Sequence, residues 1–200
     1  MSLTDRHARR IVLPAAPLTD GPTALRPWRD RDLHPLVAAC QDPEIARWTR
    51  VPEPYRDSDA RAFLLQRYDA THAGVTAPFA IVAADDDAVL LGSISLLRLD
   101  WRHLRGEVGY WLGVQARRQG HATRAVRLVC AWGQTALGLE RIDLLAATGN
   151  LASQRVAERC GFRREAVLRS YLRGRDGRLD MVAFGLLTGG ARLSAREPAT

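Results

Sequence analysis

The chain has 200 residues, a formal net charge of +7 and 29 cationic side chains, all of which are arginine. Because no lysine is present, Schiff-base chemistry and a standard P-loop are excluded. The three cysteines and five histidines show no zinc-binding spacing, so we expect no metal site. Sparse cysteines indicate a reducing compartment, and no apolar run reaches the about 18 residues of a membrane span. We therefore expect a cytoplasmic protein.

The first third of the chain predicts one strand and several helices. Residues 1–20 contain two prolines and are expected to form a loose N-terminal extension. A short first strand is predicted over residues 23–28. Helices are then expected over residues 31–41, 42–49 and 58–72.

An antiparallel meander is predicted in the middle of the chain. Apolar runs over residues 79–84 and 89–99 flank three consecutive aspartates, which favour a tight turn. Residues 107–114 alternate, so that every second side chain from Val108 to Val114 would share one face.

The rest of the chain switches to alternating helices and strands. The predicted elements are a helix over 119–137, a strand over 141–147, a helix over 151–160, and strands over 164–172 and 179–187. This order predicts an α+β fold with a mixed, largely antiparallel central sheet and helices on both faces. We expect a single domain over residues 21–188, followed by a flexible tail over residues 189–200.

The junction between a strand and a helix at Val114–Ala122 predicts a phosphate-binding loop. Gly120 permits close approach of a ligand to the backbone. Amides at a helix N-terminus lack partners and carry partial positive charge, which suits a pyrophosphate. Arg117 and Arg118 would pair with phosphate oxygens through their planar guanidinium groups, and Thr123 would add a hydroxyl. The alternative is a basic helix start with an incidental glycine.

Five separated motifs occur in a defined order. They are Leu25-Arg26-Pro27, Asp42-Pro43-Glu44, the strand Glu107–Leu112, the loop Arg117-x-x-Gly120-x-Ala122, and Asn150-x-x-Ser153 followed by Gly161-Phe162. Over roughly residues 22–187 the chain thereby resembles the GNAT superfamily of N-acetyltransferases, in its RimJ/RimL-like branch. The resemblance implies the GNAT fold with splayed central strands, and an acyl-CoA-dependent N-acetyltransferase.

The resemblance also implies a cofactor site. Acetyl-CoA, or another acyl-CoA, would lie between the strands 107–114 and 141–147. The pantetheine amides would pair with backbone groups of residues 112–114, and the pyrophosphate with amides of residues 118–122. The implied cofactor-binding residues are Leu112, Gly113, Val114, Arg117, Arg118, Gln119, Gly120, His121, Ala122, Thr123, Asn150 and Ser153. Asn150 also stands where a helix N-cap is expected, and the two roles are compatible.

Direct acyl transfer needs a base for the amine and an acid for the departing thiolate. The resemblance makes Glu107 the candidate base, acting through water, and a salt-bridged strand glutamate is the alternative. Many superfamily members use a tyrosine four residues before the Gly-Phe pair as the acid, but this chain has Ala157 there. Ser153 is therefore the candidate acid, with a role as a first-turn helix serine as the alternative. Tyr110 is a further candidate that fits the core better.

The excess positive charge is concentrated in residues 101–130 and 155–178, each with a net charge of +5. This placement favours a polyanionic cofactor, and it also fits a surface for RNA or a ribosome. The resemblance makes Trp48 and Glu165 candidate acceptor-pocket residues, with a structural role as the alternative for each. A mildly acidic wall that attracts a cationic amine is expected from Asp42, Glu44, Glu53, Asp57 and Asp59.

We therefore expect an enzyme that transfers acetyl from acetyl-CoA directly to a primary amine of a protein N-terminus or a small molecule. A catalytically silent acyl-CoA-binding module stays open because Ala157 replaces the tyrosine. A basic ribosome- or RNA-associated protein stays open too, although no RNA-binding motif is present. Similar proteins often form dimers, so a homodimer is expected, without membrane association.

Overall fold

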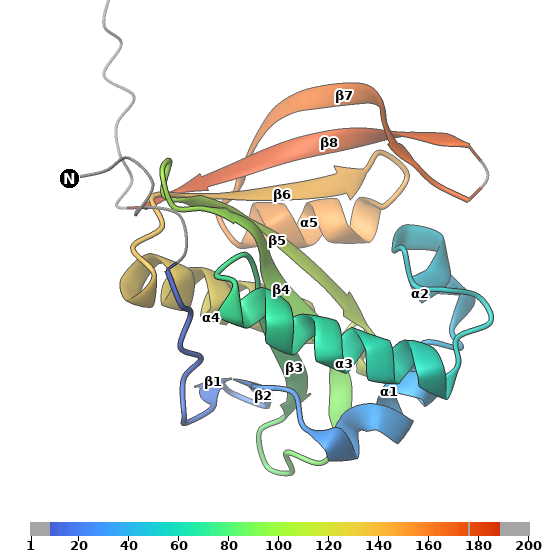
Figure 1. Ribbon diagram of the computed structural model, residues 1–200. Coiled ribbons are helices and arrows are strands. Elements are labelled where there is room, and N and C mark those ends of the chain that lie inside the picture. Colours follow the sequence, from blue (N-terminus) through green and yellow to red (C-terminus); the bar gives the residue numbers. More distant parts are fainter. Residues whose placement is uncertain (1–8, 176, 189–200) are drawn as a thin grey trace, which may run out of the picture.

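The computed structural model describes residues 9–175 and 177–188, whose strands form one eight-stranded sheet in the order β1-β2-β3-β4-β5-β6-β8-β7 (Figure 1). The strands are β1 (Leu18–Asp20), β2 (Thr23–Arg26), β3 (Ala77–Ala83), β4 (Leu90–Asp100), β5 (Arg105–Leu112), β6 (Arg141–Ala147), β7 (Arg163–Arg173) and β8 (Arg178–Leu187). The α-helices are α1 (Leu33–Ala39), α2 (Pro43–Trp48), α3 (Asp57–His72), α4 (His121–Ala136) and α5 (Leu151–Arg159). The predicted α+β fold, with a largely antiparallel sheet, is confirmed.

Helices cover both faces of the sheet because the strands alternate apolar side chains toward each face. On one face, Val126 and Val129 of α4 join the main core with Ile94 and Val108 of the strands. On the other face, a second cluster combines side chains of α1 and α3 with Trp111 of β5. Adjacent residues of β5 therefore point to opposite sides of the sheet, and the two sides carry different parts of the candidate site.

Two boundary expectations need correction. Part of the supposed loose extension is packed: Ile11 is 5% exposed in the main core, and Leu18–Asp20 pairs with β2 as an edge strand. Burial of Ile11 supplies the apolar contact that holds this segment. The central strand also ends earlier than expected, because Val114–Ala116 turns into a 3-10 helix. The expected tail over residues 189–200 lies outside the described residues.

Both ends of α5 form as the sequence predicts. Asn150 caps α5, with its Oδ1 accepting a hydrogen bond from the Ser153 amide at 3.0 Å. The helix stops at Gly161, which has a φ of 84°, and the Phe162 amide returns to the Ala157 carbonyl at 3.1 Å. This is a Schellman ending, in which the glycine accepts a left-handed conformation without strain.

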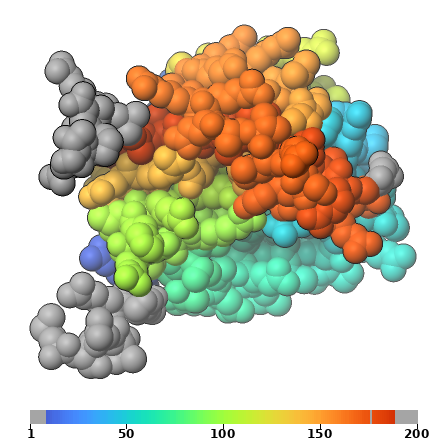
Figure 2. All heavy atoms as spheres, turned by 90° about the horizontal axis from the view of Figure 1, so that it is seen from above, coloured from blue at the N-terminus to red at the C-terminus, as the bar shows by residue number. Residues whose placement is uncertain are grey.

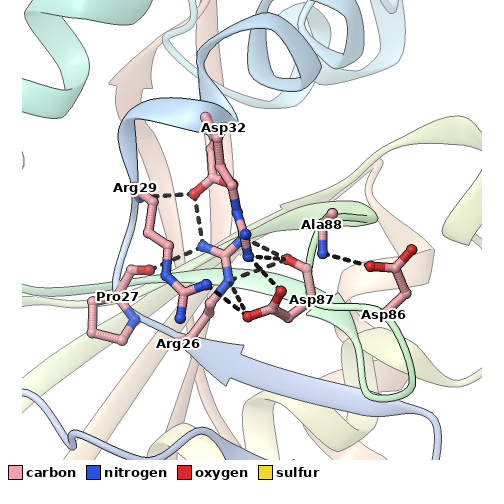
Figure 3. Close-up of polar contacts among 8 residues, drawn as sticks. Arg26, Pro27, Arg29, Asp32, Asp86, Asp87 and Ala88 are labelled. Carbon is pink, nitrogen blue, oxygen red and sulfur yellow. Dashed lines mark hydrogen bonds and ion pairs between the residues drawn. The ribbon is translucent and has the colours of Figure 1, made fainter.

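A buried ion pair joins β2 to the start of α1 (Figure 3). The side chains of Arg26 and Asp32 are each 1% exposed, and two guanidinium nitrogens donate to the two carboxylate oxygens at 2.7 Å. Arg26 also donates to the carbonyl oxygens of Pro27 at 3.0 Å and Asp87 at 2.6 Å. The pair therefore connects β2, the start of α1 and the β3–β4 turn.

The pairing of β5 with β6 is parallel and short. It joins Arg105 to Arg141, Gly106 to Ile142 and Glu107 to Asp143, and it goes no further. Beyond that point β5 stays paired with β4 up to Leu112, while β6 stays paired with β8 up to Ala147. The two strands therefore diverge, as Figure 1 shows, and leave an opening in the middle of the sheet.

We predict that Arg26→Met lowers the free energy of unfolding by about 3–5 kcal/mol, because Asp32 would stay buried without its partner. Urea denaturation followed by circular dichroism measures this change. Arg31→Met is the matched control, because Arg31 is 48% exposed and its loss should leave the midpoint nearly unchanged. Equal midpoints for the two variants would contradict the structural role of the buried pair.

Candidate active site

A cavity of about 870 Å³ opens where β5 and β6 diverge. Its walls come from α2 and the loop after it, α3, the central strands, the start of α5 and the β7–β8 hairpin. In Figure 2, atoms of the hairpin (orange to red) lie beside those of α3 (teal), with atoms of the α2–α3 segment (cyan) between them. Arg175 ties the hairpin to this segment by donating to the Ala46 carbonyl at 3.0 Å and pairing with Glu53 at 3.2 Å.

Glu107 lines this cavity at the last pair between β5 and β6. Its side chain is 18% exposed and forms an ion pair with the Nη1 of Arg98. Arg98 lies at a break in the β4–β5 register and has a φ of 51°, which is typical of a β-bulge that redirects a side chain. Burial raises the pKa of Glu107, the Arg98 and Arg50 charges oppose this rise, and Asp143 adds to it.

Ser153 also lines the cavity, and its Oγ lies 3.1 Å from the Tyr110 hydroxyl oxygen. The serine is in the first turn of α5, where the Asn150 side chain holds its amide. Burial raises the pKa of Tyr110 to about 12, so the phenol stays protonated and able to donate. Tyr110, which the sequence favoured as a core residue, thus shares the site with Ser153.

The two candidate groups approach the opening from opposite sides of the sheet. Glu107 and Tyr110 are separated by three positions on β5, so their side chains alternate to different faces. Tyr110 packs with the main core beneath α4, whereas neighbouring Trp111 packs with α1 and α3. Consequently, a proton acceptor faces the side of α3, and proton donors face the side of α5.

The opening also leaves backbone groups of β5 without a strand partner. The Gly113 amide donates to the Leu91 carbonyl at 2.9 Å, which fixes which residues of β5 face β4. By alternation, the backbone groups of Tyr110 and Leu112 point the other way, toward β6. Pairing with β6 has already ended at Asp143, so a ligand in the opening can use these groups.

This geometry corrects the expectation for residues 112–114. The Leu112 carbonyl already accepts from the Arg117 guanidinium, at 3.1 Å from Nε and 2.9 Å from Nη2. Both backbone groups of Gly113 are used, since its carbonyl accepts from the Ala116 amide at 3.0 Å. The Val114 carbonyl accepts from the Arg117 amide at 3.4 Å. These bonds close the turn locally, and among residues 112–114 they leave the amides of Leu112 and Val114 without an acceptor in the described residues. The backbone groups of Tyr110 add a position that was not expected.

The loop before α4 has the form expected of an anion cradle. Gly120 is the N-cap with a φ of 82°, and Arg118 is also left-handed with a φ of 61°. Among the described residues we find no acceptor for the amides of residues 118–122, including those of Gln119 and Ala122. A Cβ at Gly120 would lie 2.6 Å from the Nη1 of Arg124, so the end of that flexible side chain would have to move.

Two side chains of the loop are used internally rather than facing a ligand. Arg117 forms an ion pair with Asp42 at 2.5 Å as well as holding the Leu112 carbonyl. His121 is 6% exposed, and its Nδ1 lies 2.8 Å from the Thr23 hydroxyl. Their side chains therefore stabilise the loop. The Arg117 amide is also used internally, by the Val114 carbonyl, whereas the His121 amide has no acceptor among the described residues. Thr123 accepts through its carbonyl from the Cys160 thiol at 3.4 Å.

The two candidate acceptor-pocket residues behave differently. Trp48 of α2 lines the cavity, and its indole nitrogen donates to Glu44 at 3.0 Å. Glu165 lies outside the cavity lining on β7, where Arg141 holds both of its carboxylate oxygens. The ion pair with Arg141 lowers the pKa of the Glu165 carboxyl. Glu165 therefore has a structural role, in which its carboxylate holds Arg141.

The expected acidic wall is wrong. Asp42 pairs with Arg117, Glu44 with Arg47, and Glu53 with Arg175. Of the five acids, only Asp59 lines the cavity, and its Oδ2 accepts from the Arg56 amide at 2.8 Å. The cavity is instead lined by Arg47, Arg50, Arg67, Arg98 and Arg173. The Glu44–Arg47 pair is local to α2, but the sequence could not reveal the other two pairs, because Arg117 and Arg175 come from distant elements.

Within residues 9–175 and 177–188, no group of three or more His, Cys, Asp or Glu side chains is arranged to hold a metal ion. No helix in these ranges has both the length and the apolar character needed to cross a membrane.

Comparison with known proteins agrees with this architecture. Residues 23–163 match the family described as Acetyltransferase (GNAT) domain. The uncharacterized N-acetyltransferase p20 of Bacillus licheniformis is 29% identical over 163 residues, which cover 80% of this chain and 90% of that protein. RimJ of Mycobacterium smegmatis, solved in complex with CoA-disulfide, has a TM-score of 0.76 at 21% identity and covers 84% of this chain and 83% of its own.

A third similar protein is the spermidine N-acetyltransferase of Vibrio cholerae, solved in complex with CoA and spermine. It has a TM-score of 0.71 at 21% identity, covering 82% of this chain and 95% of its own. At such identities the two solved structures establish the fold, whereas the family match spans most of the present chain. The chain therefore belongs to the GNAT family of N-acetyltransferases.

Proposed function

We propose that the protein transfers acetyl from acetyl-CoA directly to a primary amine. The observation that carries this proposal is the opening between β5 and β6, which has Glu107 on one side and the Tyr110–Ser153 pair on the other. Such an opening lets an acyl donor and an amine meet from opposite faces of the sheet. Holding the acyl donor and the amine next to each other raises the rate of acyl transfer by itself, because it replaces a bimolecular encounter.

The residues present fit a bound acyl-CoA. The left-handed turn at Gly120 and the amides of residues 118–122, which have no acceptor among the described residues, suit a pyrophosphate. Backbone groups of Tyr110 and the Leu112 amide would bond the pantetheine arm as a missing strand would. Arg117, Gly113 and Asn150 hold the shape of this site through their internal bonds. When bound, acetyl-CoA supplies an acetyl group activated as a thioester.

Glu107 would act as the general base, directly or through water. An amine must lose a proton to form the new C–N bond, and a buried carboxylate with a raised pKa is a better base than an exposed one. Its partner Arg98 keeps the carboxylate ionised and fixed in direction.

The Tyr110–Ser153 pair would donate the proton that the sulfur needs when the C–S bond breaks. Either hydroxyl can donate across their 3.1 Å separation. This arrangement offers a physical answer to the missing tyrosine at Ala157, because a phenol reaches the opening from the neighbouring strand instead. The proposed acceptors are a protein N-terminus or a small-molecule amine.

The proposed function is tested by free-thiol release from acetyl-CoA with a panel of amines. The panel contains peptide N-termini, amino acids, polyamines and aminoglycosides. We expect amine-dependent thiol release together with an acetylated product of the correct mass. Tight acetyl-CoA binding without turnover of any amine would favour a silent acyl-CoA-binding module.

We predict that Gly120→Asp weakens CoA binding about tenfold more than Gly120→Asn, because the added carboxylate would face the pyrophosphate. The two side chains have nearly the same shape, and both tolerate a left-handed backbone. The Asn variant therefore controls for strain and for the contact with Arg124. Isothermal titration calorimetry measures the affinities for CoA. Equal losses of affinity in the two variants would contradict the binding of the pyrophosphate by this loop.

We also predict that Glu107→Gln lowers kcat by about 10²–10⁴-fold. A base acts only when ionised, so activity should fall as pH drops through the raised pKa of Glu107. The variant should lack this acidic limb of the kcat profile. Glu140→Gln, at an exposed position before β6, is the control and should keep the limb. An unaltered profile in Glu107→Gln would reduce this glutamate to a structural role.

A further inference from the structure

The cavity beside Glu107 carries more positive charge than its own carboxylates balance. Its lining contains five arginines, whereas the carboxylates are Glu107 and Asp59. Both carboxylates are already engaged, Glu107 by Arg98 and Asp59 by the Arg56 amide. An enzyme built for a polycationic amine would present the opposite charge, because like charges in a partly buried site repel strongly.

Arg67 of α3 is the most informative of these side chains. Burial lowers the pKa of its guanidinium, yet no carboxylate in the described residues lies within ion-pair distance. Its Cζ lies 4.5 Å from the centre of the Phe63 ring, which holds the stem in place. The guanidinium is half-buried at the cavity wall and has no hydrogen-bond or ion-pair partner among the described residues, so its donors are available to an anion from outside. Arg67 also lines a neighbouring cavity next to the outer face of α3.

Arg50 gives a second, independent indication. It lines the same cavity on the loop after α2, and it has no ion pair among the described residues. Its charge is close enough to Glu107 to lower the pKa of that carboxyl. Arg47 differs, because it pairs with Glu44 and stacks on Trp48.

We propose that the amine acceptor carries a carboxylate near its reacting amine, and that Arg67 and Arg50 bind this carboxylate. The inference rests on the proposed acetyl transfer and specifies its substrate class. The carboxylate belongs either to an acidic side chain near a peptide N-terminus or to an amino-acid-like small molecule. Planar guanidinium groups favour a carboxylate, since they donate two parallel hydrogen bonds to it.

The test compares acceptors that differ only by charge. The peptide arm uses Ala-Glu-amide against Ala-Gln-amide, and the small-molecule arm uses alanine against alaninamide, which lacks the α-carboxylate. Each is assayed by free-thiol release with saturating acetyl-CoA. We expect kcat/KM to be at least about tenfold higher for the acidic member in one arm, which also identifies the source of the carboxylate. This preference should shrink as salt is added.

Variants assign the preference to the two arginines. Arg67→Gln and Arg50→Gln should each reduce the acid-over-amide ratio of kcat/KM about tenfold. The ratio is taken within each variant, so that an effect common to both acceptors, such as a changed pKa of Glu107 after loss of Arg50, cancels. Arg61→Gln is the matched control, because Arg61 lies on the same helix and lines only the neighbouring cavity. Exposed Arg50 provides a second test if the Arg67 variant does not fold.

The outcomes separate this inference from the proposed function. Equal turnover of acidic and amide acceptors, a preference for spermidine, or an unchanged ratio in both arginine variants would overturn the inference and leave acetyl transfer intact. Absence of thiol release with every amine, although acetyl-CoA binds, would overturn the proposed function itself.

Discussion

The active site depends on one constraint, which is that β5 and β6 pair over only three positions. Each strand is held by its outer neighbour, β5 by β4 and β6 by β8, so neither can move to close the opening. The divergence has two chemical consequences. It frees backbone groups at Tyr110 and Leu112, and it lets side chains from both faces of the sheet reach the same space.

The elements around the opening are positioned by contacts far from it in sequence. The buried Arg26–Asp32 pair fixes the entry to α1, whose side chains pack with those of α3 beneath Trp111. Arg175 binds the tip of the β7–β8 hairpin to the α2–α3 segment on the opposite wall. The cavity is thus enclosed by parts of the chain that would separate without these polar links.

Arginine performs several distinct tasks in a chain that lacks lysine. Arg26 fills a buried site in which its donors are satisfied by Asp32 and backbone carbonyls. Arg117 completes the turn before the cradle, and Arg98 orients Glu107 from a β-bulge. A planar group with five donors suits such tasks better than an ammonium does. Arg67 lacks a partner of this kind in the described residues, and for that reason we infer that it binds the carboxylate of the acceptor.

The amino-acid sequence alone determined most of the elements, with the edge strand β1 as an exception, as well as the α+β class and the glycine-dependent turns. Strand β6 was predicted at its exact bounds, and the Asn150 cap and the Gly161 ending were recognised, because these features depend on bonds within a few residues. Only the tertiary structure decided which charges meet. The acids of the expected wall are neutralised by arginines up to 122 positions away, as with Glu53 and Arg175, and Tyr110 meets Ser153 across 43 positions. Such pairings depend on strand register, bulges and the divergence of β5 from β6, none of which local patterns encode.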